Sequence, residues 1–234
     1  MSRPEDARLD PALEPALARL REAAGFVVVI SGRDREFLEE RVKGLITIGS
    51  YGLELPDELS RSGLPERFPA AAVRGRLDSA RQELETEPVA GTRLEVKPWG
   101  LALHYRGAGP DYDEAGATRL AEEVADRHQL AVHRGRLVLE LKPKEAVDKG
   151  WALTLVAARL QPSGVVFVGD DLGDLPAWEA TRQLGQGIPS LAVAIASAEL
   201  PREALAGCDL VLSDRALLVG FLEELATAAE GGGA

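Results

Sequence analysis

The hydrophobic positions of this chain alternate between helical and strand-like spacing over most of its length. Residues 11–24 place leucines three and four positions apart behind Asp10, which predicts a capped amphipathic helix. Residues 26–30 form an unbroken run rich in β-branched side chains, which is typical of a buried parallel strand. A helix over 34–42 and a strand over 45–48 follow. The first part of the chain therefore predicts an α/β fold.

The middle of the chain has a different pattern, in which short segments alternate between apolar and polar side chains. It begins after a charged, alanine-rich helical stretch over 64–87. Residues 93–97 and 101–106 alternate by twos around a Pro-Trp-Gly turn, which predicts an antiparallel hairpin. An amphipathic helix and a second hairpin follow, at 113–128, 130–133 and 137–141. We therefore expect a small ββαββ insert.

The last third of the chain returns to the α/β pattern. A helix is expected over 148–160, and an apolar strand over 165–168 leads directly into three acidic residues. The remaining expected elements are a helix at 175–184, strands at 191–195 and 210–212, and a helix at 215–229. The fold class is therefore α/β, with a parallel-sheet core formed by residues 1–88 and 144–234 and an α+β cap inserted at 89–143.

Composition and charge narrow the classes of partner. The formal net charge of -11 argues against a general nucleic-acid binder, because such proteins need clustered Lys and Arg. The single cysteine, Cys208, excludes an internal disulfide and favours a reducing compartment. The sequence has neither a signal peptide nor an apolar run of about 20 residues that would span a bilayer. We therefore expect a cytoplasmic protein that binds neither membranes nor nucleic acid.

The strongest chemical signal is the segment VVFVGDDLGD at 165–174. Its apolar strand ends at Gly169 and brings Asp170, Asp171 and Asp174 onto one loop. Ligands of open parallel sheets bind just beyond the carboxyl ends of the strands, and carboxylate oxygens suit Mg²⁺. The alternative is a solvated acidic turn in which Asp174 caps the next helix.

Two further segments contain residues suited to binding phosphate. Ser31-Gly32-Arg33 follows an apolar strand, where a hydroxyl and free N–H groups at a helix start favour an anion. Lys149 follows Asp148 at the start of a predicted helix and could pair with a phosphate and a carboxylate. Each segment also has an interpretation without phosphate. The first can be a simple strand-to-helix turn, and the second can be the capped start of a surface helix. The combination of the three is more specific than any one of them.

In this order the three motifs resemble those of haloacid dehalogenase phosphatases. The insert resembles the cap of trehalose-6-phosphate phosphatases, through 94–97, 101–106 and 138–143 just before Asp148-Lys149-Gly150. The resemblance implies that Ser31, Gly32, Arg33 and Lys149 bind the phosphoryl group, with Ser31 and Lys149 in catalytic roles. It also implies that Asp170, with Asp171 and Asp174 in support, binds Mg²⁺, and that cap residues contact sugar hydroxyls: Glu95, Lys97 and Glu140.

The sequence departs from the family pattern at three places. It contains no Asp-x-Asp-Gly-Thr motif, which by resemblance would carry the nucleophile and the general acid after the first, central strand. Tyr51-Gly52-Leu53-Glu54 stands where the family usually has His-Gly-x-Glu, so Tyr51 is not counted as a site residue. Leu172-Gly173-Asp174-Leu175 replaces the usual Thr-Asp-Glu-Asp. A start at an internal Met would explain the first departure, whereas the third fits loss of catalysis.

Three functional hypotheses follow. The first is a Mg²⁺-dependent sugar-phosphate phosphatase that converts trehalose 6-phosphate to trehalose and phosphate, with the nucleophile segment absent from this chain. The second is a non-catalytic sugar-phosphate-binding or regulatory protein, and the third is a phosphatase for another sugar phosphate. Without a central strand, the chain is also expected to be poorly stable or to associate through sheet edges.

Overall fold

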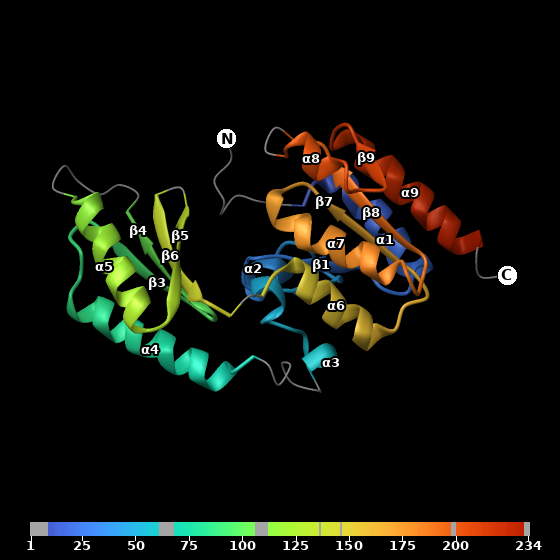
Figure 1. The fold of residues 1–234 in the computed structure, drawn as a ribbon. Helices are drawn as coiled ribbons and strands as arrows, with labels where there is room; N and C mark the ends of the chain where they lie inside the picture. The colour runs from blue at the N-terminus through green and yellow to red at the C-terminus, as the bar shows by residue number, and fades with distance from the viewer. Residues whose placement is uncertain are drawn as a thin grey trace. The chain divides into compact units, whose positions relative to one another are not determined.

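The chain folds into two compact units in a computed structural model (Figure 1). One unit, which we call the core, comprises Met1–Arg61 and Val147–Ala234, and the other, the cap, comprises Ser62–Ala146. The structure describes residues 9–60, 68–105, 112–135, 137–145, 147–197 and 200–231. No helix in these residues is both long and apolar enough to cross a lipid bilayer.

The core contains two short sheets in which all the strands are parallel. Strand β1 (Val28–Ile30) pairs with β2 (Ile46–Ile48). Strand β7 (Val165–Gly169) pairs with β8 (Ser190–Ile195), which also pairs with β9 (Leu210–Leu212). The α/β fold with parallel strands is confirmed, but the parallel sheet is present in two separate parts.

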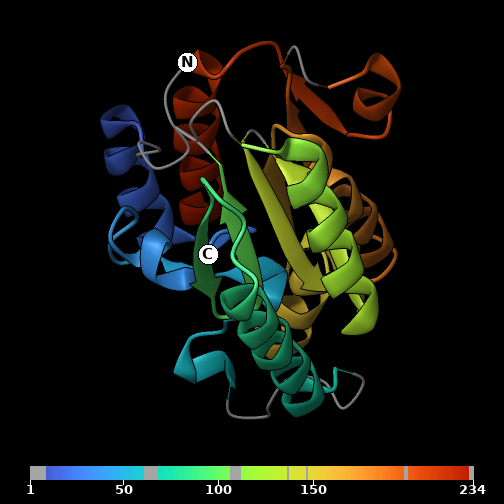
Figure 2. The same ribbon diagram turned by 90° about the vertical axis from the view of Figure 1, so that its left-hand side faces the viewer.

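Helices cover both faces of the β7-β8-β9 sheet. Successive side chains of a strand point to opposite faces, and here both sets are apolar. Val193 packs against Phe221 of α9 (Ala216–Gly231), and α9 also packs along α1 (Glu14–Ala23) (Figure 2). The neighbouring residue Ala192 faces the other way and packs against Trp178 of α7 (Leu175–Leu184). The sheet is therefore the middle layer of three.

The two core sheets share one of these helical layers. Ile30 of β1 and Phe167 of β7 pack against the same cluster, which contains Leu153 of α6 (Lys149–Leu160) and Ala177 of α7. No strand among the described residues pairs with β1 on its side away from β2, or with β7 on its side away from β8. The sequence predicts a buried strand at 26–30, but β1 is only half buried. An unpaired edge explains the difference, because no neighbouring strand covers it.

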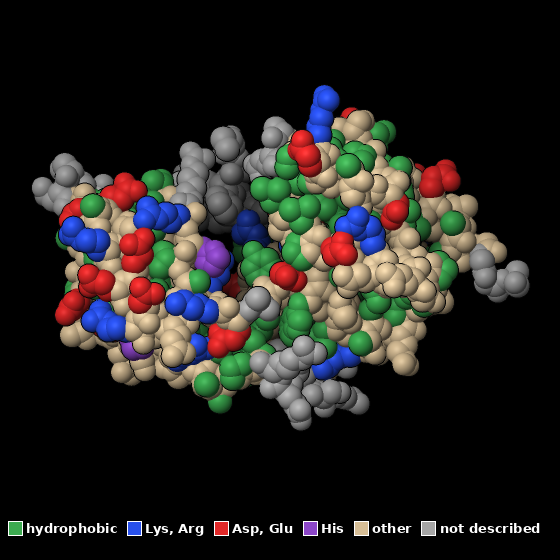
Figure 3. Space-filling view, viewed as in Figure 1, with side chains coloured by type: hydrophobic (Ala, Val, Ile, Leu, Met, Phe, Trp, Pro, Cys, Tyr) green, Lys and Arg blue, Asp and Glu red, His purple; other side chains and the backbone are tan. Residues whose placement is uncertain are grey.

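The cap is the ββαββ module that the sequence predicts. Its antiparallel sheet has the order β3-β4-β6-β5, with α5 packed against it. The bounds are β3 Arg93–Lys97, β4 Gly100–His104, α5 Glu114–Arg127, β5 Leu130–Gly135 and β6 Val138–Pro143. On the face shown in Figure 3, acidic and basic side chains are interspersed over this unit.

The boundary of the cap differs from the expected one at residue 88. The sequence pattern places helix α4 (Ala70–Thr86) in the core, whereas the helix packs against α5, β3 and β4 of the cap. Its Glu83 carboxylate pairs with His128 Nε2 at 2.8 Å. These contacts join residues far apart in sequence, so the hydrophobic spacing of the helix alone does not indicate which sheet it covers.

The remaining elements are single turns or short helices. The expected helix at 34–42 is shorter, because α2 spans Arg35–Glu39, with the Asp34 carboxylate accepting a hydrogen bond from the N–H of Phe37 at 3.2 Å. The others are η2 Pro11–Leu13, η3 Ser50–Gly52, α3 Asp57–Ser60, η4 Leu172–Asp174 and α8 Arg202–Leu205.

Candidate functional site

Most of the predicted core site residues lie at the carboxyl ends of the core strands or at the helix start that precedes β7. Strand β1 leads into Ser31, strand β7 leads into Asp170, and Lys149 is the first residue of α6. The Asp148 carboxylate fixes that helix start by accepting a hydrogen bond from the N–H of Trp151 at 2.8 Å. In sheets of this type, the carboxyl ends of the strands are where ligands bind.

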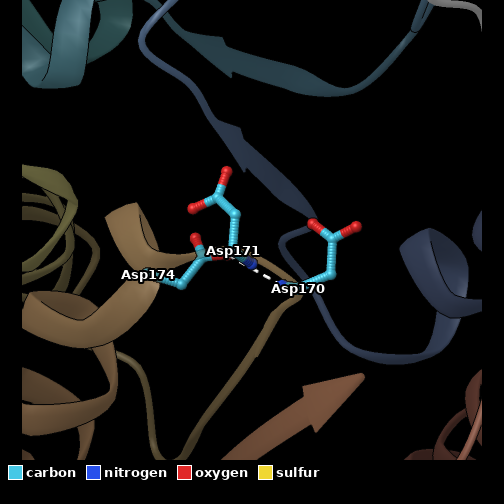
Figure 4. A group of neighbouring side chains, drawn as sticks. All are labelled: Asp170, Asp171 and Asp174. Carbon is cyan, nitrogen blue, oxygen red and sulfur yellow. Dashed lines mark hydrogen bonds between the residues drawn. The ribbon is translucent and has the colours of Figure 1, made fainter. Parts of the chain in front are cut away.

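Asp174 organises the acidic loop after β7 (Figure 4). Its Oδ2 accepts hydrogen bonds from the N–H groups of Asp170 at 2.8 Å and Asp171 at 3.0 Å. A residue larger than glycine at position 169 would collide with it, since a Cβ there would lie 2.5 Å from Asp174 Oδ2. Because residue 169 is glycine, the Asp174 side chain can lie against the end of β7 and hold the loop there.

Lys149 forms the most buried ion pair of the site. Its Nζ lies 2.6 Å from Asp174 Oδ1, and the two side chains are 13% and 4% exposed. Burial alone would lower the pKa of Lys149, but the hydrogen bond and charge of Asp174, with the charge of Asp171, outweigh it and raise the pKa. Burial raises the pKa of the Asp174 carboxyl, and Lys149 opposes that rise. Lys149 therefore stays cationic at neutral pH.

Asp170 and Asp171 complete a compact group of carboxylates. One oxygen from each of Asp170, Asp171 and Asp174 lies within 4.8 Å of the other two. Asp171 Oδ1 is a buried atom without a hydrogen-bond donor, 3.6 Å from Lys149 Nζ. Asp170 forms an ion pair with the exposed Arg215, which precedes α9. The three acidic residues therefore converge, but Asp174 already has hydrogen bonds to both of its oxygens.

The Ser31-Gly32-Arg33 loop is held by η3, the turn that follows β2. Ser31 Oγ accepts a hydrogen bond from the N–H of Arg33 at 3.2 Å, which closes the turn. The N–H of Tyr51 donates to the Ser31 carbonyl at 2.9 Å, and that of Ser50 donates to the Arg33 carbonyl at 2.8 Å. No hydrogen bond or ion pair between described residues joins the Ser31 side chain to the acidic loop.

The Arg33 side chain has a different environment from the one implied by the phosphate motif. Its guanidinium stacks on the ring of Phe37, 4.4 Å from the ring centre. Burial and the nearby charge of Arg41 lower its pKa. The Arg33 backbone therefore belongs to the loop, while its side chain packs on Phe37 of α2.

Two residues near the site carry no role in the sequence-based prediction. Arg215 lies 45 positions from its partner Asp170, a separation that no local pattern reveals. Tyr51 packs on Gly32 and is one of the groups that raise the pKa of Lys149. Its only sequence signal is its position in the Tyr51-Gly52-Leu53-Glu54 segment.

The predicted cap residues lie on one face of the cap sheet. The register aligns Glu95 of β3 with Ala102 of β4 and Glu140 of β6, so a small residue separates the two acids. Lys97 Nζ donates to Glu140 Oε1 at 2.8 Å, and Lys142 Nζ lies 2.7 Å from Glu140 Oε2. The result is a row of charged groups across the strands.

The two neighbouring lysines strongly lower the pKa of the Glu140 carboxyl. Burial alone would raise the pKa of Glu140, but the hydrogen bonds and charges of Lys142 and Lys97 outweigh it and lower the pKa to about 2. Glu95 accepts from His104 Nε2 at 2.5 Å. Glu140 is thus ionised at neutral pH, between two lysines.

Comparison with known proteins identifies relatives of this chain. A profile of the trehalose-phosphatase family matches residues 1–204. The trehalose-phosphate phosphatase of Mycobacterium avium (strain 104) is 37% identical over 205 residues, which cover 80% of this chain and 50% of that protein. The chain thus spans about half the length of the trehalose-phosphate phosphatases that it matches.

Two solved structures share the fold. A trehalose-6-phosphate phosphatase related protein superposes with a TM-score of 0.64 at 18% identity, covering 99% of this chain and 93% of that one. A haloacid dehalogenase-like hydrolase from Bacteroides thetaiotaomicron superposes with a TM-score of 0.63 at 15% identity, covering 93% of each chain. The chain has a haloacid dehalogenase-like fold, and its sequence belongs to the trehalose-phosphatase family.

Proposed function

We propose that the chain forms the phosphate- and cation-binding part of a sugar-phosphate phosphatase whose substrate is trehalose 6-phosphate. The observation that carries the proposal is the position of Lys149. Its ammonium is mostly buried and held at the strand ends by Asp174 and Asp171, so its charge is fixed where an anion would bind. A positively charged group preorganised in this way stabilises a phosphoryl group without reorganising during the reaction.

The phosphate would be bound by Lys149 together with the loop after β1. Ser31 supplies a hydroxyl, and the turn closed by the Arg33 N–H leaves the Gly32 backbone exposed. Backbone N–H groups at such a turn favour anions. Because the Arg33 guanidinium lies on Phe37 and its N–H closes the turn, we assign Arg33 the role of shaping the phosphate loop.

The acidic loop fits Mg²⁺ by its donor set. Three carboxylates lie within reach of one ion, and the buried Asp171 Oδ1 has no hydrogen-bond donor. Asp170 and Asp171 would hold the ion, while Asp174, whose oxygens are already occupied, keeps the loop in place. A bound Mg²⁺ would neutralise charge on the phosphoryl group.

The cap would recognise the sugar. Glu95, Lys97 and Glu140 present charged hydrogen-bonding groups on one face of the cap sheet. Carbohydrate hydroxyls both donate and accept, so adjacent acidic and basic groups suit them. We assign the protein to the cytoplasm, without a nucleic-acid or membrane partner, from its acidic charge and single cysteine.

Hydrolysis would need a nucleophilic carboxylate from outside this sequence, which contains no Asp-x-Asp-Gly-Thr motif. An alternative function, a non-catalytic sugar-phosphate-binding protein, is favoured by one observation: Asp170 already pairs with Arg215. Both functions require binding of the phosphorylated sugar. They differ in whether phosphate is released once the nucleophile is supplied.

The proposal is tested by calorimetric titration of the chain with trehalose 6-phosphate in the presence of Mg²⁺. Lys149→Ala should weaken binding by about tenfold or more, because hydrogen bonds to charged groups contribute about 1.5–3 kcal/mol. Lys43→Ala, at an exposed lysine of the same unit, is the matched control and should bind like the unmodified chain. Absence of binding, or equal binding by both variants, would contradict the proposal. Sucrose 6-phosphate in parallel tests the choice of sugar.

A further inference from the structure

Tyr51 has a backbone conformation that bulky residues rarely adopt. Its φ and ψ are 57° and 27°, and it lies between Ser50 with a φ of 47° and Gly52 with a φ of 107°. A left-handed conformation costs a residue with a Cβ about 1–2 kcal/mol. Such strain persists only where the surroundings enforce it, and it is concentrated at functional positions.

The surroundings of Tyr51 explain how the conformation is held. The N–H groups of Tyr51 and Ser50 donate to the carbonyls of Ser31 and Arg33 at 2.9 and 2.8 Å. On the other side, Gly52 packs against Trp151, where a Cβ on the glycine would lie 2.5 Å from Cζ3 of the indole. The backbone of η3 is therefore fixed between the Ser31 loop and the first turn of α6.

This backbone directs the phenol onto the Ser31 loop. A Cβ at Gly32 would lie 2.5 Å from the Tyr51 hydroxyl oxygen and 2.8 Å from its Cε2, so only glycine allows the approach. The next residue, Gly52, packs against Trp151, which lies two positions from Lys149 in the first turn of α6. The hydroxyl thus lies over the exposed Gly32 backbone of the loop that follows β1.

We propose that the Tyr51 hydroxyl is a phosphate ligand, which donates a hydrogen bond to a phosphate group held by the Ser31 loop and Lys149. The inference rests on the proposed function, because it assumes that this loop binds phosphate. A phenol adds a neutral, directional donor beside the Lys149 charge. It also explains why a strained tyrosine occupies a position that Asn or Gly would fill with less strain.

The experiment is a calorimetric titration of the full chain with inorganic phosphate. Tyr51→Phe keeps the ring and removes only the hydroxyl, so the Kd for phosphate should rise about tenfold. Ser31→Ala should also weaken binding. Tyr105→Phe, in the cap, is the control and should have no effect.

A second variant separates a binding role from a structural one. Tyr51→Asn removes the phenol and relieves the left-handed strain. It should therefore lose phosphate affinity without the loss of stability that a structural tyrosine would cause. Unchanged affinity in Tyr51→Phe, with weakened binding in Ser31→Ala and Lys149→Ala, would overturn the role of Tyr51 alone. Unchanged affinity in all three variants, or no binding by the unmodified chain, would overturn the proposed function as well.

Discussion

Replacing Asp174 by Asn should destabilise the core more than any other isosteric change in the acidic loop. The carboxylate is 4% exposed and accepts three hydrogen bonds, from Lys149 and from the N–H groups of Asp170 and Asp171. Asn offers only one acceptor oxygen, so at least one of these three donors loses its partner. Lys149 also keeps its charge without a carboxylate beside it, although its side chain is only 13% exposed. Removing one partner of a buried ion pair costs about 3–5 kcal/mol. We expect about 3 kcal/mol, because the lysine retains some contact with water.

The assay is urea denaturation followed by tryptophan fluorescence. In a Trp99→Phe background the emission comes from Trp151 and Trp178, which both belong to the core. A loss of about 3 kcal/mol should lower the urea midpoint by about 1–2 M. The control is Asp171→Asn, whose side chain is 50% exposed and lies 3.6 Å from Lys149 Nζ, so it should cost less than about 1 kcal/mol. Equal losses in the two variants would refute the organising role of Asp174.

Three further outcomes are expected. The pKa of Glu140 is about 2 in the folded cap against an ordinary value of 4.5, so its stabilising effect, at most about 3 kcal/mol, is present above pH 4.5 and lost as the pH falls towards 2. Acid titration of Trp99 fluorescence should show that loss, and Glu140→Gln should remove it. Gly169→Ala should lower the melting temperature, because the added methyl group would displace Asp174. Gly75→Ala, in open space on α4, should instead stabilise the cap by about 1 kcal/mol. Equal changes in melting temperature in the two variants would contradict this prediction. Hydrogen exchange of the Val28 and Val166 amides, which the strand register directs to the free edges, should be faster than that of Val193 in β8, and equal protection would show that the edges are covered.

Local patterns were sufficient for much of the fold. The alternating residues of β3 and β4, and the apolar run of β7 ending at Gly169, predict strands because each pattern matches the environment of its strand. The same patterns could not show that α4 packs with the cap. Its buried residues Val73 and Leu77 would suit a helix covering either sheet.

The site was predicted less completely than the fold. Motif order predicts that Lys149 and the acidic loop share a site, and the structure joins the two through Asp174. It could not reveal the ion pair of Arg215 with Asp170, which depends on the tertiary fold. It also gave Tyr51 no role. Tyrosine rarely adopts the left-handed conformation, so residue preferences could not predict the backbone found at Tyr51.

The most direct test of the central claim is nuclear magnetic resonance of the isotope-labelled chain during titration with trehalose 6-phosphate and Mg²⁺. We expect the backbone amide signals of Gly32, Arg33, Asp170 and Asp171 to shift in the core, and those near Glu140 to shift in the cap. Lys149→Ala should greatly reduce the shifts in the core. Shifts confined to other surfaces, or no shifts at millimolar ligand, would contradict the claim that this loop and cap face bind a phosphorylated sugar.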